Sequence, residues 1–472
     1  MNPQTTRTER DSLGEVEVPS DAYYGAHTAR AVTNFQITAT TIGNYSEFVN
    51  ALAVVKQASA TANTELGLLD KEVGAAIVAA CETIRRGEHR DQFVVDAIQG
   101  GAGTSTNMNA NEVLANVALE ILGRRRGDYV TIHPIDHVNL CQSTNDVYPT
   151  AIKLALDRYL GALLDAMARL EDSLSQKAAE FSDLLKVGRT QLQDAVPMTL
   201  GQEFGAFAVM IGEDRQRVEE TRALLRELNL GGTAIGTALN TPPDYAQVVV
   251  TELRNLTGIH SLISAPDLVE ATQDTGVFVH TSGTLKRVAI KLSKICNDLR
   301  LLSSGPRTGF GEIELPPRQA GSSIMPGKVN PVIPEVVNQI AFDVIGKDIT
   351  VSFAAEAGQL QLNAFEPVIA KSLFDSAIRL TAGCRTLADN CIDGIVANRV
   401  NLDRHLASSI ALTAALVPEI GYTAAASIAK QALDSGRGVM ELAIESGLVS
   451  QGKLDQLLNP VRVAGVKALE PH

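Results

Sequence analysis

The sequence predicts an all-α protein built around a bundle of long helices. The clearest indication is an apolar seam whose members recur at intervals of three or four residues, the period of one helix face. The seam consists of Leu156, Leu160, Leu163, Met167, Leu170, Leu174, Ala178 and Phe181. Four further helical segments follow at about 199–228, 267–303, 334–359 and 366–395. Each exceeds the length of an average helix, as in a bundle of parallel and antiparallel neighbours.

The first part of the chain, residues 1–141, is predicted to form a mainly helical N-terminal domain. Residues 15–19 alternate charged and apolar side chains like a short strand. Helices are expected at 45–69 and 71–86. A third helix is expected at 109–122, after a glycine-rich interruption.

The middle and the end of the chain are predicted to be two more domains. Residues 142–396 hold the long helical segments and would form the central bundle. Residues 397–472 are punctuated by glycines and carry two short helical segments at 438–442 and 448–458. This indicates a small helical C-terminal domain, and a length of 472 residues suits about three domains.

Composition argues against several classes of protein. No apolar run reaches the ~18 residues of a membrane span, and residues 1–10 lack the apolar stretch of a signal peptide. The net charge of −13 argues against nucleic acid as a partner, because phosphate binding needs a basic surface. The five cysteines are scattered without a Cys-x-x-Cys pair, which indicates reduced thiols and no zinc site. We therefore expect a cytoplasmic protein that binds neither nucleic acid nor membranes.

The most informative motif is one polar loop. It reads Gly321-Ser322-Ser323-Ile324-Met325-Pro326-Gly327-Lys328-Val329-Asn330-Pro331. Glycine allows close backbone approach to a ligand, and proline restricts the loop. Pro331 and Pro334 suit the start of the helix that follows, where unpaired N–H groups and a positive dipole end are available. Such a loop can receive an anion and place a hydroxyl beside it, although the residues alone also fit an ordinary glycine-proline connection.

Three further polar loops interrupt the helical pattern. They span residues 101–107, 142–146 and 188–194 and are rich in Thr, Ser, Asn and Gln. Taken singly, such residues at helix starts usually act as caps. Their shared composition favours a common role, because all four side chains can donate hydrogen bonds to carboxylate oxygens without adding net charge.

In their order along the chain, the four loops resemble the active-site regions of the aspartase/fumarase superfamily. Members of that superfamily eliminate ammonia or water from succinyl-type substrates to give fumarate. The likeness covers nearly the whole chain, from Tyr23-Tyr24-Gly25 to the C-terminal domain. It implies a three-domain, all-α lyase whose long helices form a 20-helix core in a homotetramer, with each active site shared by three subunits. The alternatives are a class II fumarase (fumarate hydratase) and a non-catalytic helical protein that kept the fold.

Three places resemble the ammonia-lyase branch more than the fumarases. Residues 141–150 read Cys-Gln-Ser-Thr-Asn-Asp-Val-Tyr-Pro-Thr, Gln191 stands where fumarases carry histidine, and Glu366 stands where fumarases tend to place a basic residue. A histidine suits water activation, whereas Gln191 cannot take up a proton. Gly327 is a fumarase-like departure. The resemblance thus implies reversible elimination of ammonia from L-aspartate through an aci-carboxylate intermediate.

The resemblance also implies a catalytic base and a set of carboxylate ligands. Ser322 is expected to be the base, and N–H groups of its loop could hold its oxyanion. The loop is expected to close over the substrate, with Gly321 and Gly327 as hinges. The residues expected around the side-chain carboxylate of the substrate are Thr104, Ser143, Thr144 and Ser323.

Five further residues are expected to hold the rest of the substrate. By resemblance, Lys328 and Asn330 bind the other carboxylate with help from Thr190. Asn145 and Gln191 would orient the amino group. The expected small-molecule partners are L-aspartate, fumarate and ammonium. No cofactor is expected to be required. Some relatives are activated by magnesium at alkaline pH, but no acidic cluster in this sequence can be assigned to that ion.

Overall fold

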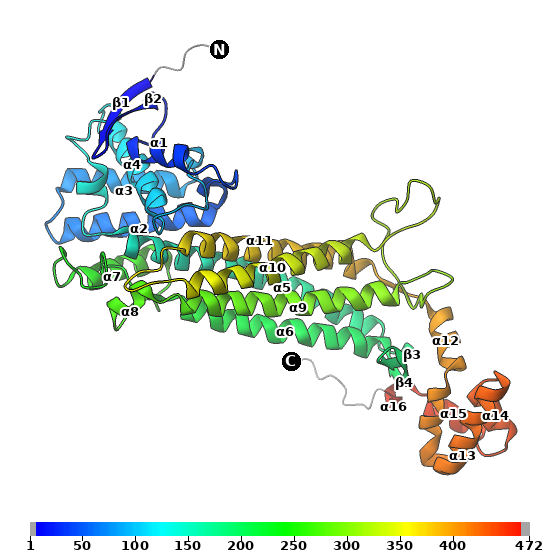
Figure 1. Ribbon diagram of the computed structural model, residues 1–472. Coiled ribbons are helices and arrows are strands. Elements are labelled where there is room, and N and C mark those ends of the chain that lie inside the picture. The colour runs from blue at the N-terminus through cyan, green and yellow to red at the C-terminus, as the bar shows by residue number, and fades with distance from the viewer. Residues whose placement is uncertain (1–5, 464–472) are drawn as a thin grey trace. The chain divides into compact units, whose positions relative to one another are not determined.

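The computed structural model describes residues 6–463, and most of them are helical (Figure 1). The helices are α1 (Ala26–Asn34), α2 (Ser46–Glu65), α3 (Lys71–Arg85), α4 (Thr104–Ile121), α5 (Thr144–Glu180), α6 (Leu200–Leu224), α7 (Tyr245–Thr257), α8 (Leu268–Gln273), α9 (Gly276–Leu302), α10 (Val332–Glu356), α11 (Glu366–Asn390), α12 (Arg399–Ser408), α13 (Thr413–Ser435), α14 (Val439–Glu445), α15 (Gln451–Leu457) and α16 (Pro460–Val463). The prediction of an all-α fold is confirmed.

The strands of the described residues are short and pair two by two. They are β1 (Thr6–Asp11) with β2 (Gly14–Pro19), β3 (Leu185–Thr190) with β4 (Gln193–Thr199), β5 (Glu227–Leu228) with β6 (Ile263–Ser264), and β7 (Ile313–Glu314) with β8 (Val396–Ala397). The β5–β6 pair is parallel and the other three pairs are antiparallel.

The chain divides into two compact units. Unit 1 holds the chain up to Leu163 together with residues 217–286 and 343–379. Unit 2 holds residues 164–216 and 287–342 and the chain from Leu380 onward. The divisions fall inside long helices, so that α5, α6, α9, α10 and α11 each contribute a segment to both units. The three domains expected from the sequence, with limits after residues 141 and 396, stay a prediction.

Most predicted helices form close to their expected bounds, with two instructive differences. Helix α4 begins at Thr104 rather than near Asn109, so Thr104 lies on a helix and not in a loop. The segment 267–303 forms two helices, α8 and α9. The break occurs at Asp274, whose carboxylate accepts a hydrogen bond from the backbone N–H of Gly276 (2.9 Å) and so caps α9.

The apolar seam of α5 is buried within the chain itself. Leu156, Leu163 and Met167 are 0% exposed. The chain itself therefore covers this apolar seam. Exposed apolar side chains lie instead on α10, where Phe342, Ile349 and Phe353 are 56–72% exposed.

The C-terminal helices enclose a small hydrophobic core of their own. Its buried members are Leu412, Leu416, Ile428, Ala432, Val439, Leu442, Ala443, Val449, Leu454 and Leu457. These residues come from the 3₁₀ helix Ile410–Leu412, from α13, α14 and α15, and from the loop between α14 and α15. A segment with few long helices can therefore still bury apolar surface as a unit.

One apolar stretch, Ile410–Ser435, is long enough to cross a membrane by length and composition alone, with a mean hydropathy of 1.3. The sequence-based expectation that no stretch would qualify is corrected here. The backbone of Gly421 is not helical (φ 78°, ψ 161°), so α13 is interrupted, and neither half reaches the ~20 residues of a span. Leu416 and Ile428 of this stretch are buried in the C-terminal core. The stretch therefore packs as part of a folded domain.

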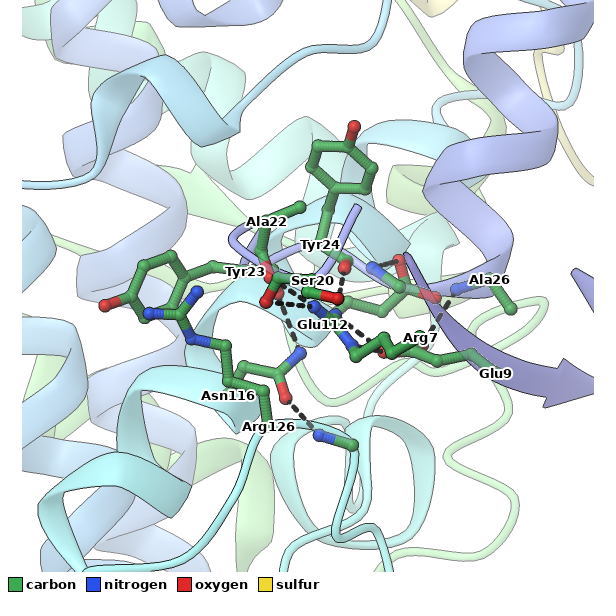
Figure 2. A network of polar contacts seen from close by, with 12 residues as sticks. Arg7, Glu9, Ser20, Ala22, Tyr23, Tyr24, Ala26, Glu112, Asn116 and Arg126 are labelled. Carbon is green, nitrogen blue, oxygen red and sulfur yellow. Dashed lines mark hydrogen bonds and ion pairs between the residues drawn. The ribbon is translucent and has the colours of Figure 1, made fainter. Parts of the chain in front are cut away.

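Two buried carboxylates hold the start of α1 (Figure 2). Glu112 of α4 accepts hydrogen bonds from the backbone N–H groups of Gly25 and His27, both at 2.8 Å, and Glu9 accepts from that of Ala26 (3.1 Å). An anion at a helix N-terminus is favourable because the N–H groups are unpaired there. Burial nevertheless raises the pKa of Glu112 to about 7. This network attaches the β1–β2 hairpin and α1 to α4.

Candidate active site

The polar loops that precede α4 and α5 lie together in unit 1. Gly103, just before α4, has a φ of +88°, and a Cβ atom there would lie 2.5 Å from the ring of Tyr148 on α5. Only glycine permits this approach. One turn into α4, Asn107 donates a hydrogen bond from Nδ2 to Thr144 Oγ1 (3.2 Å). Thr104 and Thr144, the first residues of α4 and α5, therefore stand at the starts of two adjacent helices.

Ser143 directly precedes α5 and caps it. Its Oγ accepts a hydrogen bond from the backbone N–H of Asn145 (3.2 Å), while Asp146 Oδ1 accepts from the N–H of Ser143 (2.9 Å). This is the reciprocal capping arrangement of a helix start. A hydroxyl that accepts one bond keeps its hydrogen for donation. Capping and ligand binding are therefore compatible at Ser143.

The side chain of Asn145 is oriented by the chain around it. Its Nδ2 donates a hydrogen bond to the backbone oxygen of Ala234 (2.7 Å), and its own backbone oxygen accepts from Asn229 Nδ2 (2.9 Å). Because Nδ2 is engaged, Oδ1 is the atom left to accept a hydrogen bond from a ligand. An ammonium group is such a donor, and the role expected for Asn145 stays a prediction.

A glycine-rich loop, residues 229–236, supports this site and was not among the loops predicted from the sequence. Asp146 Oδ2 accepts hydrogen bonds from the backbone N–H groups of Gly231 (3.0 Å) and Thr233 (2.9 Å). Burial raises the pKa of Asp146 to about 6, although these N–H groups and the charge of Lys56 act against the rise. The pair Gly231-Gly232 was the signal available in the sequence, because glycine pairs mark turns and loops. In the structure, Gly231 has a φ of +96°.

Glu366 is a buried carboxyl at the start of α11. Burial raises its pKa to about 8, and the positive charge of Lys153 on α5 offsets this only in part. Burial also lowers the pKa of Lys153, whose Nζ donates a hydrogen bond to the backbone oxygen of Glu227 (2.8 Å). Glu366 thus belongs to a pair of buried ionisable groups in unit 1.

In unit 2, the loop from Gly321 to Asn330 closes on itself. The N–H of Gly321 donates a hydrogen bond to the backbone oxygen of Lys328 (2.8 Å), and Asn330 Nδ2 donates to the backbone oxygen of Gly321 (2.9 Å). A Cβ atom at position 321 would lie 2.6 Å from the Lys328 oxygen. Gly321 is therefore needed for close approach at the base of the loop, while its role as a hinge stays a prediction.

The Ser322 hydroxyl lies among backbone donors within this loop. Its Oγ accepts hydrogen bonds from the N–H groups of Ile324 (3.2 Å) and Met325 (3.0 Å). Two N–H dipoles that converge on one oxygen stabilise negative charge on it. These two N–H groups could hold a Ser322 oxyanion, and the role of Ser322 as the base stays a prediction. Ser323 and Lys328 in the same loop are exposed.

A cavity of about 720 Å³ adjoins the loop in unit 2. Its lining includes Lys328 and Asn330 from the loop and Arg300, Arg318 and Glu314 from the segments around it. Arg318 is fixed by a hydrogen bond from Nε to the backbone oxygen of Asn390 (2.6 Å). Three cations against one carboxylate give the lining a positive balance, which favours an anionic ligand.

Thr190 and Gln191 lie at the tip of the β3–β4 hairpin, also in unit 2. Thr190 pairs with Gln193, so the turn consists of Gln191 and Leu192. Both have positive φ values, +54° and +61°, which defines a tight hairpin turn of type I′. Asparagine and glycine are the usual residues there, and the left-handed conformation costs other residues roughly 1–2 kcal/mol each. Backbone strain of this kind is concentrated at functional sites.

The structure gathers the predicted residues into separate groups. Thr104 and residues 143–145 belong to unit 1, and the Thr190–Gln191 turn and the Ser322 loop belong to unit 2. Two polar contacts of the hairpin reach distant segments of the chain: Arg189 pairs with Glu312, and Asp194 accepts a hydrogen bond from Ser409. Arg189, Glu312 and Ser409 were not singled out from the sequence, which carries no pattern that would connect them.

No group of three or more His, Cys, Asp or Glu side chains that could hold a metal ion occurs among residues 6–463. All five cysteines are free thiols. Burial raises the pKa of all five. Four of them, Cys81, Cys296, Cys384 and Cys391, are also fully buried, which keeps these thiols protonated and unreactive.

Comparison with known proteins places these loops in a family. A family model described as a lyase matches residues 14–346, and one described as the fumarase C C-terminus matches residues 412–465. The chain is 56% identical over 455 residues to the aspartate ammonia-lyase of Pseudomonas fluorescens, covering 96% of this chain and 95% of the relative.

Solved structures agree. A crystal structure of fumarate lyase:delta crystallin from Brucella melitensis bound to cobalt superposes with a TM-score of 0.95 at 56% identity, covering 98% of this chain and 100% of the other. A class II fumarase from Schistosoma mansoni superposes with a TM-score of 0.91 at 36% identity, covering 98% of this chain and 99% of the other.

The fold and the four polar loops thus define a lyase of the fumarate-forming type. The chain belongs to the lyase family within the aspartase/fumarase superfamily. It is more similar to the aspartate ammonia-lyase, at 56% identity, than to the class II fumarase, at 36%. This order agrees with the three places, residues 141–150, Gln191 and Glu366, that resemble the ammonia-lyase branch in the sequence.

Proposed function

We propose that this protein is an aspartate ammonia-lyase, a carbon–nitrogen lyase that converts L-aspartate reversibly into fumarate and ammonium. The observation that carries the proposal is the convergence of two backbone N–H groups on Ser322 Oγ, in a closed loop that also bears Lys328 and Asn330. A serine held in this way can act as a base, because its oxyanion is stabilised. The near-full-length identity to an aspartate ammonia-lyase supports the same conclusion.

The reaction begins with removal of a proton from the carbon next to the side-chain carboxylate. Ser322 takes this proton, and the electron pair moves into the carboxylate to give a doubly negative aci-form. The pair then forms the carbon–carbon double bond as the C–N bond breaks and ammonia leaves with the bonding electrons. The C–H group is a very weak acid. Stabilising the aci-form with preorganised donors is therefore the largest catalytic effect, at about 3–4 kcal/mol for each good donor.

The donors proposed for the aci-carboxylate are neutral hydroxyls. They are Thr104, Ser143, Thr144 and Ser323. Hydroxyls suit this task because they can strengthen their hydrogen bonds as charge develops without attracting the substrate too strongly in its ground state. The hydrogen of Ser143, which its capping contacts leave unused, is one such donor.

The remaining groups hold the parts of the substrate that do not react. Lys328 and Asn330, with Thr190, bind the other carboxylate, and the positive balance of the adjacent cavity supports this assignment. Asn145 and Gln191 orient the amino group, and the free Oδ1 of Asn145 is an acceptor suited to an ammonium. Closure of the exposed Ser322 loop would exclude water and strengthen these contacts.

We further propose a homotetramer in which three subunits contribute to each active site, around a shared 20-helix core. Two observations support it. Phe342, Ile349 and Phe353 form an exposed apolar row on α10, a long helix with a high apolar content. Exposed apolar rows of this kind mark interaction surfaces. The proposed substrate residues also fall into groups on different compact units.

Two further properties belong to the same proposal. The protein acts in the cytoplasm, where its five free thiols would remain reduced. The reaction needs no cofactor, because the proposed residues supply both the base and the charge stabilisation. Magnesium activation at alkaline pH is an effect to be tested in the assay.

The deciding experiment follows the ultraviolet absorbance of fumarate with purified protein. L-Aspartate and malate are supplied separately. An aspartate ammonia-lyase forms fumarate from L-aspartate and leaves malate essentially unchanged, because Gln191 cannot activate water. Formation of fumarate from malate as readily as from aspartate would identify a fumarase. No reaction with either substrate would indicate a non-catalytic relative.

A further inference from the structure

Glu312 is a buried carboxylate in unit 2 that the proposed chemistry does not use. Its Oε1 lies 2.7 Å from Arg189 Nη1 and 3.2 Å from His405 Nδ1, and its Oε2 lies 3.0 Å from Lys186 Nζ. The side chain is 0% exposed. Burial alone would raise the pKa of Glu312, but the charges of Lys186 and Arg189 outweigh it and hold the pKa below its ordinary value. An ionised carboxylate therefore anchors two residues of β3.

Arg189 links the Glu312 carboxylate to the hairpin turn. It directly precedes Thr190 and pairs across the hairpin with Asp194, after a register irregularity that begins at Val187. Its guanidinium carbon also lies 4.2 Å from the ring centre of Phe310, a favourable cation–π contact. The guanidinium is thus held by the Glu312 carboxylate and by an aromatic ring, one residue before the strained turn.

The opposite strand is held from the C-terminal part of the chain. Ser409 donates a hydrogen bond from Oγ to Asp194 Oδ2 (2.8 Å), and His405 of α12 reaches Glu312. Helix α12 packs against β3, and the short 3₁₀ helix Ile410–Leu412 packs against β4. Both strands of the hairpin are therefore attached to the same C-terminal segment.

We propose that Glu312 and Ser409 are positioning residues that hold the strained turn in place, and that they couple the C-terminal helices to substrate binding. The substrate contact itself, made by Thr190 and Gln191, rests on the proposed function. The physical reason is the cost of the two left-handed residues in the turn, which would relax if the strands were released. A displacement of 1 Å at a substrate contact can lower the rate by about 100-fold.

Three variants and a matched control test the proposal by kinetics with L-aspartate. Glu312→Gln and Ser409→Ala each remove one anchor, and Ser409→Thr restores the hydroxyl. Asp403→Asn is the control, since Asp403 is an exposed carboxylate on α12. Both anchor variants should lower kcat/KM by about 10- to 100-fold, chiefly through a higher KM. Ser409→Thr and Asp403→Asn should keep a kcat/KM and a KM close to those of the wild type. A merely structural role would lower the melting temperature and leave KM unchanged.

Hydrogen exchange of the backbone amides of residues 185–199 provides a reading that does not depend on activity. Exchange should be at least about 10-fold faster in Glu312→Gln and Ser409→Ala than in Asp403→Asn. If the wild type deaminates L-aspartate while both anchor variants keep its KM and its protection, the proposal is overturned and the function stands. If the wild type does not act on L-aspartate, the proposed function fails. Exchange alone then decides whether Glu312 and Ser409 hold the turn.

Discussion

The ring of Tyr148 on α5 lies directly against the Cα atom of Gly103, the residue that precedes α4. A Cβ atom at position 103 would lie 2.5 Å from the ring, closer than packed atoms allow, and the residue already has a φ of +88°. The contact brings together the helix starts that carry Thr104 and Thr144. A single glycine thus sets the geometry of one half of the candidate site.

Gly103→Ala should lower the free energy of unfolding by about 2–4 kcal/mol, because overpacking adds to the cost of a left-handed alanine. Gly123→Ala is the matched control. Gly123 also has a positive φ, +70°, but no atom lies within 4 Å of the Cβ position. Gly123→Ala should lower the free energy of unfolding by about 1–2 kcal/mol. Denaturant unfolding followed by circular dichroism measures both. Equal losses would show that the contact with Tyr148 is not limiting.

Ser322→Ala should reduce kcat by several orders of magnitude and leave binding of fumarate nearly intact, because a base acts mainly in the chemical step. The measurement combines steady-state kinetics with calorimetric binding of fumarate. Ser175→Ala, at an exposed position of α5, is the control for a loss of any serine hydroxyl. Near-normal turnover by the Ser322 variant would assign the base to another residue.

Lys328→Ala should impair both binding and turnover, since the ammonium contacts a carboxylate that is charged in the ground state and in the transition state. KM should rise and kcat should fall, whereas in Ser322→Ala the loss should lie in kcat. Lys430→Ala is a suitable control, because Lys430 is an exposed lysine of α13. A Lys328 variant with unchanged KM would remove this residue from the substrate site.

Shared active sites predict complementation between inactive variants. Ser143→Ala/Thr144→Ala and Ser322→Ala proteins are unfolded together, refolded and assayed. If three subunits contribute to each site, some sites in a mixed tetramer contain only intact loops, so activity should appear that neither parent has. Native mass spectrometry must show that the subunits have mixed. Mixed tetramers without activity would mean that all the loops of a site belong to one chain.

The pair Glu366 and Lys153 predicts a pH dependence of stability. The folded-state pKa of Glu366, about 8, lies above its ordinary value of 4.5, so the folded protein binds this proton more tightly. The resulting stability is fully present below pH 4.5 and is lost as the pH rises toward 8. The free energy of unfolding of the wild type should therefore fall between pH 5 and 8. The fall should be smaller in Glu366→Gln than in the wild type, by up to about 4 kcal/mol.

Glu356→Gln, at an exposed position near the end of α10, provides the matched control for this titration. It should keep the wild-type fall in stability between pH 5 and 8. Unfolding by denaturant at several pH values gives the comparison. A Glu366 variant that follows the wild-type curve would show that this carboxyl does not titrate in the range.

Much of the fold could be predicted because helical periodicity is local information. The seam on α5 and the bounds of α2, α3, α10 and α11 follow from spacing and composition within a few turns. Errors occurred where a distant contact decides. Helix α4 begins at Thr104, several residues before its predicted start, next to the contact between Gly103 and Tyr148.

Some parts of the candidate site could likewise be recognised from the sequence, and other parts are related only by the structure. The loop from Gly321 to Asn330 is recognisable in sequence because its hydroxyls, lysine and glycines are contiguous. Arg189, Glu312 and Ser409 are spread over more than 200 residues and share no spacing, so only the structure relates them. The loop at 229–236 lies between these cases, since its glycines were visible but its contacts with Asn145 and Asp146 were not.

By itself, the sequence determined the all-α class, the family and the chemical groups available for catalysis, because each depends on residue type and near-neighbour spacing. Only the tertiary structure decided how those groups are oriented. The two N–H groups at Ser322 Oγ, the engaged amide of Asn145 and the buried Glu312 beneath a strained turn all depend on backbone conformation and on burial. A hydrogen bond requires distance and angle, and a carboxylate pKa requires a local dielectric. Both arise only when segments far apart in the chain pack together.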